Sequence, residues 1–111
     1  KKVDLKNKLL VSNGRTLVPV RVLSEALGLP IQYNAGTKTA IIQSGDTLIE
    51  MPLGYNVAVV NGQVIQIDSE DSNVKSTIQD NRAYLPIRFI AEQLNLKVNF
   101  NNGEIQIHSA Q

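Results

Sequence analysis

The chain contains no cysteine, no tryptophan and only one histidine, His108. Without cysteine it can form no disulfide, no thiolate nucleophile and no zinc site built on sulfur. One histidine cannot build a metal site alone, and no recognisable serine nucleophile motif accompanies it, so we interpret His108 as a surface or strand-end residue. No spacing of histidine, acidic, serine or lysine residues indicates an activated nucleophile or an acid/base pair. We therefore expect no catalytic residue, no metal and no cofactor.

The chain also lacks long apolar runs and a large net charge. No apolar stretch approaches the ~20 residues of a membrane-spanning helix, so we expect no membrane span in this segment. The net charge of +1 is +3 from residues 1–55, with seven Lys/Arg against four Asp/Glu, and −2 from residues 56–111, with four against six. Neither half is basic enough to indicate a nucleic-acid partner. A length of 111 residues with 42% apolar residues predicts a single folded domain, residues 1–111.

What the chain does have is a repeat, in which the same pattern of residues occurs twice, sixty-seven positions apart. Residues 13–27 match residues 80–94. The repeated residues are ones that set backbone geometry rather than chemistry. Such a repeat indicates a duplicated structural unit. We place the repeat units at about residues 9–43 and 74–108, joined by a β-meander at residues 47–67. The matching residues are Arg15 and Arg82, Pro19 and Pro86, Arg21 and Arg88, and Glu25 and Glu92.

Each repeat unit predicts a hairpin, a helix that starts at proline, and a second hairpin. In the first unit, apolar runs at residues 9–11 and 16–18 flank an Asn-Gly pair, which is a strong signal for a hairpin turn. Pro19 then opens a helix, because proline at the first helical position gives up only an amide hydrogen that has no partner there. Gly28 fits a left-handed C-terminal cap, and Asn95 at the matching place tolerates the same conformation.

The stretch between the two units alternates with the period of a β-strand, at residues 47–51, 57–60 and 64–67, with turn residues between them. Every strand connection without a helix is short enough for an antiparallel pair. We therefore predict an α+β fold in which twisted antiparallel hairpins pack on two short helices, with an internal duplication.

Two pairs of opposite charge lie four residues apart on the predicted helices. Arg21 with Glu25, and Arg88 with Glu92, can form ion pairs along the side of a helix. A functional alternative makes each arginine an anion binder near the positive end of its helix. We favour a structural role, in which arginine and glutamate clamp the hairpin onto the helix, because both residues occur in both copies.

Three carboxylates, those of Asp68, Glu70 and Asp71, lie in the polar connector before the second unit. Carboxylate oxygens suit a hard cation such as calcium, but these lack the glycine and the spacing of an EF-hand loop. We expect a solvated linker here rather than a metal site.

Aromatic residues are few, with three tyrosines and two phenylalanines. Tyr55, in the turn at residues 53–56, is the aromatic that we expect to be exposed, and an exposed aromatic in a loop can stack on a sugar or anchor a partner. Tyr33, Phe89 and Phe100 fit core positions better. Tyr55 is therefore the candidate ligand contact.

The repeated motif also points to a family. Residues 13–21 are Asn-Gly-Arg-Thr-Leu-Val-Pro-Val-Arg, residues 24–28 are Ser-Glu-Ala-Leu-Gly, and residues 86–92 are Pro-Ile-Arg-Phe-Ile-Ala-Glu. Together they closely resemble the copper amine oxidase N-terminal-like domain, over nearly the whole chain. That family is a stalk-type module that recurs in secreted and surface-attached proteins of Gram-positive bacteria, often beside cell-wall-binding or hydrolase domains. Oxidase chemistry in the full enzymes needs a modified tyrosine and three histidine ligands for copper in another domain, so the resemblance implies a non-catalytic module.

The resemblance implies an extracellular or cell-surface location and a stalk, spacer or protein-interaction role, with the other domains of a larger protein as partners. The alternative is a module that binds cell-wall glycan or another polysaccharide through Tyr55 and polar strand residues. A surface protein is a further expected partner, and exposed sheet edges leave a homo-oligomer open. The chain starts at Lys1 without the apolar stretch of a signal peptide, so either that segment was removed or the chain is a piece of a longer protein. We favour the second alternative, because a hairpin precedes only the second unit.

Overall fold

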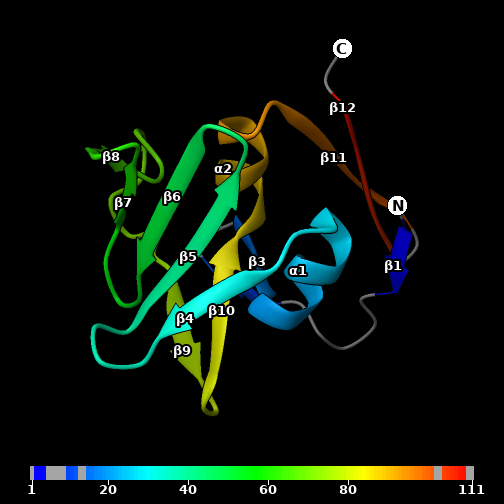
Figure 1. Cartoon of the computed structure of the whole chain (residues 1–111). Helices are drawn as coiled ribbons and strands as arrows, with labels where there is room; N and C mark the ends of the chain where they lie inside the picture. Colours follow the sequence, from blue (N-terminus) through cyan, green and yellow to red (C-terminus); the bar gives the residue numbers. More distant parts are fainter. Residues whose placement is uncertain (1, 5–9, 13–14, 102–103, 110–111) are drawn as a thin grey trace.

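The computed structural model describes residues 2–4, 10–12, 15–101 and 104–109. The chain forms twelve strands and two helices within these residues (Figure 1). The strands are β1 (Lys2–Asp4), β2 (Leu10–Ser12), β3 (Arg15–Pro19), β4 (Ile31–Asn34), β5 (Thr39–Ser44), β6 (Thr47–Pro52), β7 (Val57–Val60), β8 (Gln63–Gln66), β9 (Thr77–Gln79), β10 (Arg82–Pro86), β11 (Leu96–Asn101) and β12 (Glu104–Ser109). The helices are α1 (Val20–Leu27) and α2 (Ile87–Gln93).

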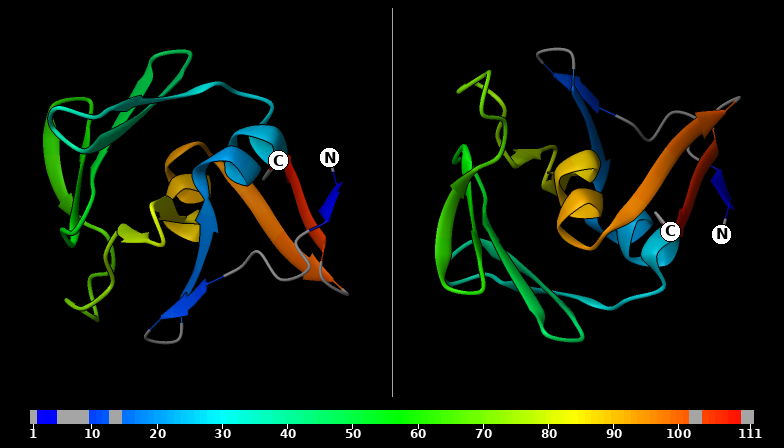
Figure 2. Two further views of the ribbon diagram at one scale, coloured as in Figure 1. Left: turned by 90° about the horizontal axis from the view of Figure 1, so that it is seen from below. Right: turned by 90° about the horizontal axis from the view of Figure 1, so that it is seen from above.

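The strands form three sheets, with the orders β1-β12-β11, β2-β3-β10-β9 and β4-β5-β6-β7-β8. Every pair of neighbouring strands is antiparallel. Figure 2 shows the two helices between the five-stranded sheet on one side and the three-stranded sheet on the other. The predicted α+β class, with antiparallel hairpins and two short helices, is confirmed.

The two strands that end in proline pair with each other at the centre of the four-stranded sheet. Val18 lies opposite Leu85, and on either side of this pair Leu17 lies opposite Pro86 and Pro19 opposite Tyr84. Each helix also contacts the proline-ended strand of the other unit, α1 contacting β10 and α2 contacting β3. The two units are thus interleaved at the core, while the duplication itself stays a prediction.

Both helices begin one residue later than the sequence predicts. Pro19 has an extended backbone, with φ −56° and ψ 141°, and is the N-cap of α1 rather than its first helical residue. Pro86 is likewise the N-cap of α2, with ψ 107°. Proline suits this place because its fixed φ is compatible with both a strand and the start of a helix. It has no backbone N–H to donate, and the sheet tolerates the loss of one donor at the end of a strand.

The helix ends agree with the sequence. Gly28 is left-handed at φ 70°, and its amide donates to the carbonyls of Ser24 at 3.0 Å and Glu25 at 3.3 Å. Asn95 is also left-handed, at φ 59°, one residue after the C-cap of α2. A residue with positive φ lets the chain leave the helix while amides still reach the last carbonyls.

The core lies where the helices meet the inner face of the five-stranded sheet. Alternate residues of β5, β6 and β7 point inward and are fully buried, namely Ala40, Ile42, Ile49, Met51 and Ala58. This alternation is the period-2 pattern of a sheet with one covered face. From the helices, the buried apolar residues are Val22, Leu23, Ala26, Ile87, Phe89, Ile90 and Ala91.

Two expectations about aromatic residues meet different outcomes. Phe89 is buried on α2, as predicted, whereas the side chain of Phe100 is outside the described part. The prediction that Tyr33 belongs to the core is wrong, because 44% of it is exposed. Tyr33 lies opposite buried Ala40, but β4 is an edge strand, so no further strand covers the ring.

The first and last strands of the described residues, β1 and β12, are adjacent in one sheet (Figure 1). β1, which the sequence does not predict, pairs with β12, with Lys2 opposite Gln106 and Asp4 opposite Glu104. In the described part of the chain, neither helix has the length or apolarity to span a membrane.

Candidate functional site

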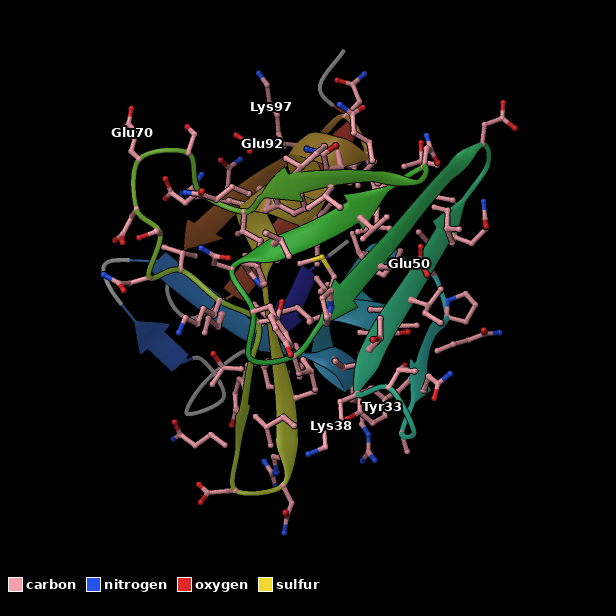
Figure 3. The ribbon with its side chains drawn as sticks, turned by 90° about the vertical axis from the view of Figure 1, so that its left-hand side faces the viewer. Tyr33, Lys38, Glu50, Glu70, Glu92 and Lys97 are labelled. Atoms are coloured by element: carbon pink, nitrogen blue, oxygen red, sulfur yellow. The ribbon has the colours of Figure 1, made fainter. Side chains whose placement is uncertain are left out.

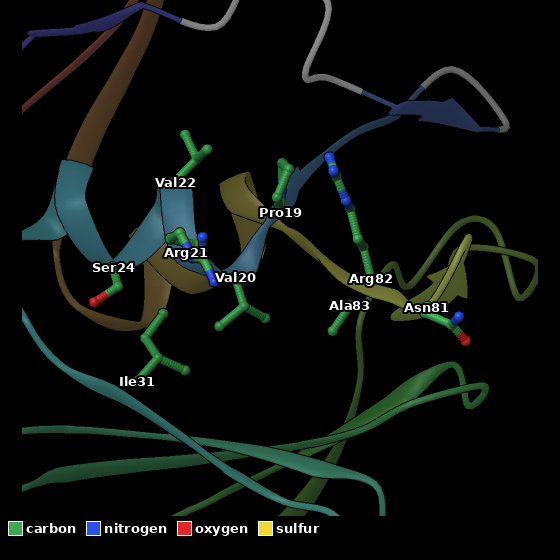
Figure 4. A pocket seen from close by; sticks show the side chains of 9 residues that line it. All are labelled: Pro19, Val20, Arg21, Val22, Ser24, Ile31, Asn81, Arg82 and Ala83. Carbon is green, nitrogen blue, oxygen red and sulfur yellow. The ribbon is translucent and has the colours of Figure 1, made fainter.

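An open groove of about 760 Å³ lies between the start of α1, the edge strand β4 and the hairpin of β9 and β10 (Figure 4). Two parts of the chain that are far apart in the sequence, residues 19–31 and 81–83, therefore meet here. The groove is lined by Pro19, Val20, Arg21, Val22, Ser24, Ile31, Asn81, Arg82 and Ala83. Its volume suits a small organic molecule rather than a bare ion.

A tight turn positions the β10 side of the groove. Asp80 and Asn81 both have positive φ, 53° and 61°, which is the backbone of a two-residue hairpin turn with the twist of its strands. The sequence anticipated this turn from its match to the Asn-Gly pair of the first copy. Because the turn ends at Arg82, which pairs with Gln79 as the first residue of β10, this arginine lies at the rim of the hairpin.

The start of α1 provides the other side. Pro19 pairs with Tyr84 on β10, so the first turn of the helix is held next to the strand that carries Arg82. Arg21 is the second residue of α1. Figure 4 shows Arg21 and Arg82 with Pro19 and Val20 between them in the view.

Among the described residues, the charge lining this groove is of one sign. The nine described residues that line it include two arginines and no carboxylate. Both arginines are exposed, and within the described residues neither side chain forms an ion pair or a hydrogen bond. Asp80, two residues before Arg82, does not line the groove. The two guanidinium groups are therefore not neutralised by a partner in this part of the chain.

The rest of the lining is apolar or already hydrogen-bonded. Val20, Ile31 and Ala83 are half-buried and give the groove an apolar surface. The hydroxyl of Ser24 donates to the carbonyl of Leu29 at 2.5 Å, so its hydrogen is engaged within the protein. Asn81 is exposed and brings a side-chain amide.

The ion pair expected along α1 is absent among the described residues. Arg21 and Glu25 are both exposed, and the structure forms no contact between their charges. On α2, Arg88 does interact with another residue, and it lines a second cavity of about 250 Å³ together with Glu92 and Lys97 (Figure 3 labels the latter two). The two helices thus carry matching residues in different surroundings, and the proposed clamp stays a prediction.

The remaining repeat residues lie in the strands that pair at the centre. Pro19 and Pro86 are buried at the ends of β3 and β10. Arg15 begins β3 opposite Ser12, and its side chain is not among those described. Of the repeat residues, Pro19, Arg21 and Arg82 line the groove at the start of α1, and Arg21 and Arg82 are the charged ones.

Tyr55 is exposed, as the sequence predicts, with 63% of its surface accessible. It follows Gly54, whose φ is 88° and whose amide donates to the carbonyl of Ser76 at 2.7 Å, so the loop between β6 and β7 is anchored just before the ring. Tyr55 lies outside both grooves. Its contact with a ligand stays a prediction.

The acidic connector uses its carboxylates to hold its own backbone. Asp68 accepts a hydrogen bond from the amide of Glu70, and Asp71 accepts one from the amide of Asn73, both at 2.9 Å. Such local bonds are typical of turns. No group of three histidine or acidic residues that could hold a metal comes together in the described ranges. His108 lies on β12, and nothing is described of its side chain.

The sequence did not bring Arg21 and Arg82 together, because they belong to different repeat units and occupy different positions within them. No signal in the sequence could have found this arrangement, because it depends on the long-range pairing of β3 with β10, in which Pro19 opposite Tyr84 holds the first turn of α1 beside the start of β10. Val20, Ile31, Asn81 and Ala83 were not singled out at all. Their apolar or amide side chains carry no motif of their own.

Residues 1–109 match the family model of the copper amine oxidase N-terminal domain. A search of curated proteins found no match. The N-terminal domain of this family is a non-catalytic part of copper amine oxidases, separate from the catalytic domain. Since the match covers nearly the whole chain, from its first residue to the end of β12, the chain belongs to the copper amine oxidase N-terminal domain family.

Proposed function

We propose that this domain is a non-catalytic extracellular module of a larger secreted or cell-surface bacterial protein, where it acts as a spacer or presents a surface to another protein. The observation that carries the proposal is the place of the repeated prolines, Pro19 and Pro86. They end the two strands that pair at the centre of the fold, which is an architectural role. A family of non-catalytic domains supports the same conclusion.

The position of the chain ends bears on the choice between spacer and interaction module. With principal extents of 33 × 32 × 28 Å, the domain is nearly as wide as it is long. Because β1 and β12 are adjacent, flanking chain would enter and leave on the same side. A module of this kind projects from its parent protein as a lobe, which favours presentation of a surface over extension in line.

The parent gene provides the first test of this function. We expect its full reading frame to contain a signal peptide and wall-anchoring or catalytic neighbours. A short cytosolic frame that ends near Gln111 would overturn the extracellular role.

Replacement of the domain in the parent protein separates the two roles. An unrelated domain of similar size with adjacent ends should restore function if this one only sets a distance. If only this domain restores function, it presents a specific surface. A parent protein that works equally well after simple deletion contradicts both roles.

A second function, binding of cell-wall glycan or another polysaccharide, is supported by the exposed ring of Tyr55. Exposed aromatic rings stack on the apolar faces of sugars. In a pull-down with purified peptidoglycan, we expect the Tyr55→Ala variant to lose retention and Tyr33→Ala, which removes a ring that is 44% exposed on another edge, to keep it. Consistent absence of binding by the unchanged domain would rule this function out.

A further inference from the structure

We propose that the groove between α1, β4 and the β9–β10 hairpin is a binding site for a small organic anion, one that carries a carboxylate or a phosphate on a carbon skeleton. This site is independent of the spacer role, which needs no ligand. The site also differs from Tyr55, which lies outside the groove.

The two arginines of the groove determine the charge of the ligand. Arg21 and Arg82 line one cavity. Among the described residues, no acidic side chain lines this cavity and neither arginine side chain has a partner. A cleft lined by charge of one sign concentrates counter-ions of the other sign. Guanidinium groups offer paired N–H donors that match the oxygens of a carboxylate or a phosphate. The free donors of this groove therefore select an oxyanion.

The remaining lining determines the rest of the ligand. Val20, Ile31 and Ala83 leave half-buried apolar surface inside the groove, which a fully hydrated inorganic ion would not use. A carbon skeleton that lies against these residues would bury apolar area at the same time as its anionic group meets an arginine. Asn81 adds an amide that can donate to or accept from a hydroxyl of the ligand. A cavity of about 760 Å³ has room for such a molecule.

The interleaved fold explains why the two arginines are found together. Arg21 comes from the first repeat unit and Arg82 from the second, and the pairing of Pro19 with Tyr84 brings their segments together. The groove is therefore formed only when both units are folded against each other. Either half of the chain alone would carry only one of these two arginines and no groove.

The test uses the whole chain and two pairs of matched ligands. Amide chemical shifts are followed by NMR in a low-salt buffer free of phosphate, with glucuronate against glucose as the carboxylate pair and glycerol 3-phosphate against glycerol as the phosphate pair. We expect at least one anion to shift the amides of residues 20–24 and 81–83 with a dissociation constant in the millimolar range, and its neutral partner to leave them unchanged. The anion that binds more tightly identifies the oxyanion.

Variants separate this groove from the general charge of the surface. Arg21→Gln and Arg82→Gln should each weaken the anion about tenfold, because each removes a charge-assisted hydrogen bond. Arg21→Lys should fall between, since it keeps the charge but loses the planar fork. Lys75→Gln removes the same charge from an exposed residue outside the groove and should leave the affinity unchanged.

Three results would overturn the proposal: no shift in the groove with either anion, equal shifts with the neutral partners, or equal weakening by Lys75→Gln. Because Arg21 and Arg82 are exposed, their variants should stay folded, which the dispersion of the same spectra reports. None of these results affects the spacer role.

Discussion

At the scale of single residues, the informative positions are the few that break a general rule of protein interiors. Ser76 is completely buried, and its hydroxyl has no hydrogen-bond partner within the described residues. A buried hydroxyl usually has one, because it loses its bonds to water on folding. Its backbone is used, since the carbonyl of Ser76 accepts the amide of Gly54 at 2.7 Å. The serine side chain itself therefore adds nothing favourable to the fold.

We expect Ser76→Ala to raise the free energy of unfolding by about 1 kcal/mol, because it removes a desolvated donor that has no partner. Ser24→Ala is the matched control, since that hydroxyl donates to the carbonyl of Leu29 at 2.5 Å. Loss of this bond lowers the free energy of unfolding by about 1 kcal/mol, and the higher helix propensity of alanine restores roughly half of that amount. Urea denaturation measures both, and a destabilised Ser76→Ala would contradict the reasoning.

Substitutions at Gly28 and Asn95, which follow the two helices, should change the free energy of unfolding in opposite directions. Gly28→Ala should lower the free energy of unfolding by about 1 kcal/mol, because φ is 70° and alanine is strained there. Apart from its chain neighbours, no described atom lies within 4 Å of the added carbon, so the cost is one of backbone conformation alone. Asn95→Gly, at φ 59°, should be neutral or stabilising. Thermal denaturation compares the stability of the two variants, and a Gly28→Ala variant as stable as the unchanged domain would contradict this prediction.

At the scale of helices and strands, most of what the sequence predicts concerns neighbours along the chain. Turns with positive φ at Asn61, Asp80 and Asn81, and the cap at Gly28, follow from local chemistry that does not depend on the rest of the fold. Pairing between strands that are far apart in the sequence does not follow from local chemistry. The sequence gives no sign that β3 pairs with β10, or that the strand at Lys2–Asp4 joins β12, because antiparallel partners are chosen by burial of the whole sheet.

The candidate site follows the same division. The arginines stood out in the sequence as repeated residues, but the groove that joins Arg21 to Arg82 is a product of the long-range pairing of Pro19 with Tyr84. For Tyr33, the local pattern led to a wrong prediction. Its alternation fits a covered sheet face, yet its strand lies at the edge, a fact that only the sheet order reveals.

One turn joins three strands of the five-stranded sheet, and we predict its effect. The side-chain oxygen of Asn61 accepts the amide of Leu48 at 2.8 Å, and the amide of Asn61 donates to the carbonyl of Leu48 at 2.9 Å. Asn61→Ala should cost about 1–2 kcal/mol, because it loses one bond and strains a residue at φ 50°. Asn61→Gly should lose only the bond. Hydrogen exchange should accelerate at the amide of Leu48 in both variants, and unchanged exchange would argue against the bond.

At the scale of the whole molecule, the adjacency of β1 and β12 predicts that the chain ends can be joined. A circular permutant that links the ends by a short glycine-serine segment and opens between Gly45 and Asp46, in the exposed turn from β5 to β6, should fold and unfold cooperatively. A permutant opened between Glu50 and Met51, inside a central strand, is the control that should not fold. Circular dichroism and urea denaturation decide, and failure of the first permutant would mean that the ends are not neighbours.

The same pair of strands also determines how the domain responds to mechanical tension. Lys2 lies opposite Gln106 and Asp4 opposite Glu104, so the start of β1 and the end of β12 point out of the sheet at the same end. A force that pulls the two termini apart would unzip these strands, because it loads the hydrogen bonds between them one after another. In shear geometry, by contrast, all of the bonds would be loaded at once. β1 would therefore detach at low force and lengthen the tether, while the core around Val18 and Leu85 would stay folded.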